Sequence, residues 1–289
     1  MKPWLILATV ILGLLATAVI IGNRKQVEVA ARAVPDVSAQ SNPQPMGKRT
    51  PVIVELFTSE GCSSCPPADE VLARLERTQP VEGAEIIALG EHVDYWNYIG
   101  WSDPFSSPVF GERQGSYAEA FGRDGNYTPQ MVVDGRAEFV GSNWNKAVAA
   151  ITQAARAPKA NVEITPARKN TGAVSLQVRA GNLPAVTAGD TVDLLLAITE
   201  ENLSSNVSRG ENAGRRLNHR TVVRQLSLIG SAEAKHGASF SAESTLTLAK
   251  GWKPENLRAV AFAQERKSRR VIGAGVVKLA SGSGANVRN

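Results

Sequence analysis

The residues best suited to chemistry are two cysteines separated by two serines, Cys62-Ser63-Ser64-Cys65. They are the only cysteines among the 289 residues, so within one chain each can pair only with the other. Two thiols at this spacing can cycle between dithiol and disulfide. Because the disulfide would close a very short loop, it would stabilise the fold less than a bridge between distant residues. The pair therefore indicates redox exchange, with an inert disulfide and metal ligation as alternatives.

The flanking residues predict that the pair lies at the start of a helix. An apolar, β-branched stretch over 51–58 precedes it and is typical of a buried strand. Val71, Leu72 and Leu75 follow at helical spacing, and a helix tolerates proline in its first turn. The unpaired N–H groups and the dipole at a helix N-terminus favour a thiolate, so we expect the pKa of the Cys62 thiol to be lowered there.

Further elements follow in alternation. An apolar stretch over 85–90 predicts a second strand, and the patterns over 110–121 and 143–155 predict helices. Between them, the residues from 130 to 140 predict a hairpin that turns at Asp134-Gly135. Thr128-Pro129 comes directly before this hairpin.

This order of elements resembles the thioredoxin fold over about residues 50–157. The resemblance implies that Pro129 is a cis proline beside the dithiol and that Thr128 presents backbone groups to an extended partner. It also implies that an acidic residue on the strand before the cysteines assists proton transfer. Glu55 lies in that strand and is the candidate; the alternative is a solvated or ion-paired carboxylate.

A longer resemblance covers most of the remaining chain. The segments 54–69, 92–101 and 209–224 are similar to an exported bacterial family known as domain of unknown function 1223. The family name carries no settled activity. The resemblance implies a thioredoxin-like first domain extended by a β-rich second one.

The second half of the chain predicts antiparallel β structure. Alternating or apolar stretches recur near 161–165, 173–178, 192–198, 239–249, 257–263 and 271–279. We therefore expect the fold class to be an α/β thioredoxin-like domain, 50–157, followed by an antiparallel β-sandwich-like domain, 158–280. Residues 281–289 read as a disordered tail. A polar loop is expected over 202–220, where Arg215 and Arg216 are candidates for binding an anionic substrate or form a solvated surface.

The N-terminus predicts export. Residues 4–21 form an apolar run long enough to span a bilayer, and Ala31-Arg32-Ala33 offers a cleavage pattern. Residues 1–33 are thus a signal peptide or a membrane anchor, and 34–49 form a flexible linker. We expect a periplasmic or other extracytoplasmic location, secreted or anchored to the inner membrane. A net charge of +5 without long runs of like charge gives no reason to expect nucleic acid as a partner.

The residues after the second predicted strand leave two interpretations open. His92 could join Cys62 and Cys65 as a ligand for Cu(I) or Zn, or it could be a hydrogen-bonded structural residue. Trp96 and Trp101 could form an apolar platform for a substrate beside the dithiol, or they could pack in the core.

The functional hypothesis is an extracytoplasmic thiol–disulfide oxidoreductase that needs no cofactor. Its partners would be protein or small-molecule thiols and disulfides. Cys62 would attack, Cys65 would resolve the mixed disulfide, and Thr128-Pro129 would position the partner. The alternatives are a thioredoxin-like metallochaperone for copper or zinc, and a non-catalytic binding module with a vestigial dithiol.

Overall fold

The computed structural model describes residues 49–168, 173–233 and 235–279. The predicted signal peptide or anchor (1–33), the predicted linker apart from residue 49, and the predicted tail (281–289) lie outside the described residues. Within the described ranges, no helix is long and apolar enough to cross a membrane.

The elements of the first half lie where the sequence predicts them. They are β1 (Thr50–Thr58), α1 (Pro66–Thr78), β2 (Ala84–His92), a short 3-10 helix η1 (Asn97–Ile99), α2 (Pro108–Ala120), β3 (Gln130–Val133), β4 (Ala137–Val140) and α3 (Trp144–Ala154). The hairpin at Asp134-Gly135 is confirmed, with φ values of 50° and 60°. The expected cis peptide bond between Thr128 and Pro129 is also present.

The second half is built from strands. They are β5 (Asn161–Arg168), β6 (Val174–Gly181), β7 (Thr191–Glu200), β8 (Leu203–Asn206), β9 (Arg216–His219), β10 (Val222–Glu233), β11 (Phe240–Leu246), β12 (Leu257–Glu265) and β13 (Val271–Lys278). The expectation of a plain loop over 202–220 was wrong, because β8 and β9 form a two-stranded ribbon there. Leu217 and His219 are buried on one side of β9, and the residues between and beside them are exposed.

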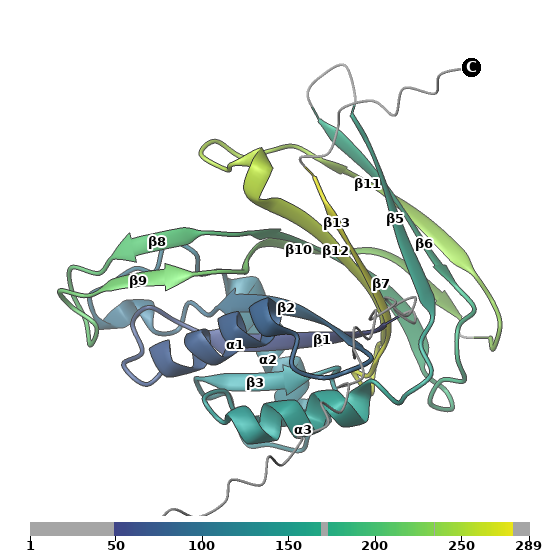
Figure 1. The fold of residues 1–289 in the computed structure, drawn as a ribbon, viewed down its shortest axis with the longest axis horizontal. Helices are drawn as coiled ribbons and strands as arrows, with labels where there is room; N and C mark the ends of the chain where they lie inside the picture. Colours follow the sequence, from purple (N-terminus) through teal and green to yellow (C-terminus); the bar gives the residue numbers. More distant parts are fainter. Residues whose placement is uncertain (1–48, 169–172, 234, 280–289) are drawn as a thin grey trace, which may run out of the picture. The chain divides into compact units, whose positions relative to one another are not determined.

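Strands from both halves share one mixed sheet, in the order β13-β12-β7-β10-β2-β1-β3-β4 (Figure 1). β1 and β2 are parallel, and β10 joins the free side of β2 in parallel through Val222 opposite Gly90. The Gly90 amide donates to the Thr221 carbonyl over 2.7 Å at this junction. β5, β6 and β11 form a separate three-stranded antiparallel sheet.

The predicted fold class, an α/β thioredoxin-like domain followed by a β-sandwich-like domain, was therefore wrong. The described chain is mostly β-strand, with an eight-stranded mixed sheet and only three short α-helices within the described ranges. The physical reason lies in β7 and β12, which are nearly fully buried and carry continuous apolar runs over 194–198 and 259–263. Strands with such continuous apolar runs belong inside a sheet that is covered on both faces.

The first half buries apolar side chains on both faces of the sheet. Alternate residues of a strand point to opposite faces. Val54 and the other even-numbered residues of β1 pack with Leu72 of α1 and Ile151 of α3. Ile53 and Phe57 pack on the other face with α2. Each helix of the first half thus holds one face of β1, which leads directly into the cysteines.

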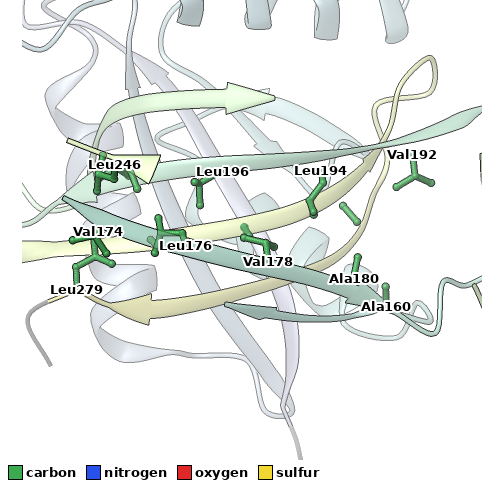
Figure 2. Packing of buried hydrophobic residues seen from close by; sticks show 14 of the residues in the cluster. Ala160, Val174, Leu176, Val178, Ala180, Val192, Leu194, Leu196, Leu246 and Leu279 are labelled. Carbon is green, nitrogen blue, oxygen red and sulfur yellow. The ribbon is translucent and has the colours of Figure 1, made fainter. Parts of the chain in front are cut away.

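A third apolar cluster holds the three-stranded sheet against the large one. Figure 2 shows Leu176 and Val178 of β6 facing Leu194 and Leu196 of β7. The backbones come close where β13 passes β5. A Cβ added at Gly275 would lie only 2.3 Å from the Val162 carbonyl oxygen. Only glycine leaves room for that approach.

This contact yields a stability prediction. Gly275→Ala should lower the free energy of unfolding by about 1–3 kcal/mol, because the added methyl group must displace the β5 backbone. Gly115→Ala is the matched control: a Cβ there, within α2, meets nothing within 4 Å. Alanine is the better helix former, so this control should stabilise the protein by up to about 1 kcal/mol. Urea unfolding of the parent protein and both variants measures these changes. Equal midpoints for the three proteins would contradict the close contact between β13 and β5.

Candidate functional site

The two cysteines form a disulfide at the start of α1. Their Cα atoms are 5.4 Å apart, and Cys65 is the residue before the first helical turn, where its carbonyl accepts from the Ala68 amide. Both residues have zero exposed surface, whereas Ser63 and Ser64 between them are exposed. The bond thus lies at a helix N-terminus, as the sequence predicts, but it is covered.

Glu60, two residues before Cys62, is the centre of a buried polar network. Its carboxylate accepts from the Trp101 indole N–H at 2.9 Å and lies 2.8 Å from His219 Nε2. Its backbone N–H donates to Asp103 Oδ2 at 2.8 Å, and its backbone carbonyl accepts from the Asn212 side-chain amide at 2.9 Å. A buried carboxylate needs such partners, because leaving it unpaired costs several kcal/mol. The network fixes the turn that carries the cysteines.

The loop between β8 and β9 covers the disulfide. Asn212, which is 1% exposed, also donates to the Cys62 carbonyl at 2.9 Å. Glu211 accepts from the Ser63 amide at 2.8 Å, and Arg215 Nη1 donates to Asn212 Oδ1 at 2.6 Å. The segment that contacts the cysteine turn is therefore about 150 residues downstream of it in the sequence.

His92, a predicted metal ligand in one hypothesis, is ion-paired. Its Nδ1 lies 2.7 Å from Asp103 Oδ2, and its ring centroid is 4.7 Å from that of His219. Burial alone would lower the pKa of His92, but the charge and hydrogen bond of Asp103 raise it above its usual value. Burial alone would raise the pKa of Asp103, and His92 holds it below its usual value. In the described part of the chain, no three His, Cys, Asp or Glu side chains are grouped to hold a metal.

The residues predicted to position a partner lie beside the cysteine turn. Gln130 pairs with Phe57, so Pro129 is next to the end of β1. The Trp96 indole donates to Thr128 Oγ1 at 2.7 Å. A Cβ added at Gly61 would lie 3.2 Å from the Trp96 Cβ, so this tryptophan joins the cysteine turn to the Thr128 loop. Trp96 and Trp101 are both half-buried and in contact with the site.

Glu55 lies elsewhere. As an odd-numbered residue of β1 it belongs to the α2 face of the sheet, with Ile53 and Phe57, and it is fully buried there. Arg113 Nε donates to its carboxylate at 2.5 Å, and the Tyr117 hydroxyl donates to the same carboxylate. No described contact joins Glu55 to the cysteines, so its structural surroundings match those of an ion-paired strand carboxylate.

A different acidic residue is near the disulfide. Asp69 is one helical turn after Cys65, and its amide donates to the Cys65 carbonyl at 3.1 Å. Side chains four residues apart lie on the same face of a helix. Burial raises the pKa of Asp69, while the nearby charges of His219 and His92 act in the opposite direction.

Sequence reasoning missed the network around the cysteines. Glu60 lies close to the cysteine motif, but nothing in the sequence distinguishes it from an ordinary loop carboxylate. No local sequence pattern predicts the role of Asp103. His219 and Asn212 reach the site only through the tertiary fold. The one signal that could have found them is that the family resemblance includes the segment 209–224.

Comparisons with known proteins identify a family and similar solved structures. A family model described as "Protein of unknown function (DUF1223)" matches residues 53–264. Protein AGR_C_4864 from Agrobacterium tumefaciens has a similar structure, with a TM-score of 0.60 and 23% identity over 79% of this chain and 94% of that one. HBP35 of Porphyromonas gingivalis has a TM-score of 0.58 and 16% identity over 83% of this chain and 79% of its own. At these identities the similarity shows the fold alone, and no curated protein matches the chain.

The Glu55 cluster yields a prediction about pH. Glu91 is fully buried, and its carboxylate lies 3.6 Å from Arg113 Nε. Burial, followed by the charge of Glu55, raises the pKa of Glu91 well above its usual 4.5. The folded state therefore binds this proton more tightly than the unfolded state does. Stability should fall as the pH rises from about 4.5 towards the folded-state pKa, at up to about 1.4 kcal/mol per pH unit.

Glu91→Gln should remove that slope, since glutamine keeps the shape and does not titrate. Denaturant unfolding of the parent protein and the variant at several pH values checks this. A variant with the parent's pH dependence would show that Glu91 is not the group responsible.

Proposed function

This chain belongs to the DUF1223 family, whose function is unknown, and we propose that it is an extracytoplasmic thiol–disulfide oxidoreductase working through Cys62 and Cys65. The observation that carries the proposal is the disulfide between the chain's only two cysteines at the start of α1. A helix start stabilises the thiolate that forms when the bond opens. The apolar run over 4–21 supports export to an oxidising compartment, where such a bond persists.

The reaction uses the two cysteines in different roles. In the reduced protein, the Cys62 thiolate attacks a disulfide of the partner and forms a mixed disulfide. Cys65 then attacks Cys62, which releases the partner as a thiol and closes the bond at α1. The partner disulfide gains two electrons and the Cys62/Cys65 dithiol loses them. Thr128 and Pro129 border the turn and position the partner, with Trp96 and Trp101 as the flanking aromatic surface.

The first test uses the two single-cysteine variants of the full chain. Cys65→Ser should accumulate a mixed disulfide at Cys62 when mixed with oxidised glutathione or with a disulfide-bonded protein, because the resolving thiol is missing. Cys62→Ser should accumulate much less, since its remaining thiol is the resolving one. Mass spectrometry under denaturing conditions measures both. No adduct in either variant would mean that the pair is a static cross-link.

The cover over the disulfide gives a second prediction. Asn212→Ala removes three hydrogen bonds, two to the Glu60 and Cys62 carbonyls and one from Arg215. At about 0.5–1.5 kcal/mol each, their loss should make loop opening more frequent by at least about tenfold. Reduction of the disulfide by dithiothreitol should accelerate by a similar factor, as followed by thiol alkylation.

Asn218→Ala is the matched control for this prediction, because Asn218 is exposed on β9 and contributes none of these bonds. It should be reduced at the parent's rate. Equal rates for all three proteins would show that the loop does not limit access to the sulfur atoms.

A further inference from the structure

A pocket of about 300 Å³ lies between the start of α1 and strand β9, immediately beyond the disulfide. Pro66 and Pro67, which directly follow Cys65, line one side, and Arg215 and Arg216 line the other. The β8–β9 ribbon and α1 run next to each other in Figure 1. The volume is at the lower end for small-ligand sites and is too small for a folded partner.

The pocket lining holds two arginines whose side-chain hydrogen bonds go to neutral groups. Arg215 donates to the neutral Asn212 side chain, and Arg216 donates to the neutral Ser204 hydroxyl at 3.2 Å. Asp69 also lines the pocket, at a half-buried position of α1. Glu70 is the remaining carboxylate of the lining, on the exposed side of α1. The two guanidinium groups, whose hydrogen bonds go to neutral partners, can bind an anion through paired hydrogen bonds.

The pocket is also connected by hydrogen bonds to the cysteine turn, through Arg215 and Asn212. Arg215 holds the Oδ1 atom of Asn212, and the amide of the same side chain holds the Cys62 carbonyl. An anion bound at Nη1 of Arg215 would compete with Asn212 for that donor group. Its binding would therefore loosen the loop at the residue that fixes it to the cysteine turn.

We propose that this pocket binds the carboxylate of a small anionic thiol, of the acidic-peptide class to which glutathione belongs, and holds its sulfur beside the Cys62–Cys65 bond. This inference rests on the proposed exchange function and names its substrate class. The thiolate of the ligand attacks Cys62, the Cys62–Cys65 bond breaks, and Cys65 takes the electron pair and a proton. A second ligand thiolate attacks the mixed disulfide, releasing the ligand disulfide and the Cys62 thiol. Two ligand thiols are oxidised and one protein disulfide is reduced.

The test compares glutathione with 2-mercaptoethanol, which has no carboxylate, in reducing the full chain. Rate constants are expressed per thiolate, so that the different ionised fractions of the two thiols do not enter. The ratio of the glutathione to the 2-mercaptoethanol rate constant should be about 10 at low ionic strength. It should fall severalfold as salt is added, because salt screens exposed charges.

Arg216→Gln should lower this ratio at least threefold. Arg209→Gln removes the same charge from an exposed position of the same loop outside the pocket lining, and it should keep the parent's ratio. A ratio near 1 that neither salt nor Arg216→Gln changes would overturn the pocket assignment and leave the exchange function standing. If neither thiol reduces the protein, the exchange function fails, and the pocket assignment with it.

Discussion

The candidate site depends on one buried carboxylate, that of Glu60. A carboxyl group with 1% exposure is stable only with hydrogen-bonding partners, and Glu60 obtains them from two distant parts of the chain. Trp101 comes from the segment after η1, and His219 comes from β9. Because the Glu60 backbone is bound as well, by Asp103 and Asn212, the cysteine turn cannot shift without breaking the network. The loop that supplies Asn212 is thereby held against the cysteine turn.

The large sheet makes this arrangement possible. β10 lies beside β2, and β9 comes just before β10 in the chain, so the ribbon reaches the C-terminal end of β1 where the cysteines lie. The local elements could be predicted from sequence, since the apolar patterns of β1, α1 and β2 and the turn at Asp134-Gly135 depend on neighbouring residues. The pairing of Gly90 with Val222 could not, because it joins residues more than 130 positions apart and leaves no local pattern. This contact continues the first-half sheet into β10, β7, β12 and β13, so these strands do not form the separate sandwich that was expected.

The same distinction applies to the site. Cys62, Cys65 and the Thr128–Pro129 bond belong to short motifs, and the structure brings them to one end of β1. For Glu55, the face of the sheet depends on its position in β1. Successive residues of a strand point to opposite faces, and Glu55 points towards Arg113 and away from α1. Asn212 could not be assigned a role from its type, since an asparagine in a glycine-rich loop is ordinary. Its importance follows only from its two carbonyl partners.

A buried disulfide at a helix start fits the proposed exchange function, in which the helix start favours the thiolate and the hydrogen-bonded loop controls access. A static cross-link would need neither feature. The most direct measurement is the reduction potential of the Cys62/Cys65 pair, obtained by equilibrating the protein with a series of dithiol buffers at pH 7 and counting free thiols. An exchanging pair should have a value between about −270 and −120 mV. A value below about −300 mV, typical of structural disulfides, would contradict the exchange function.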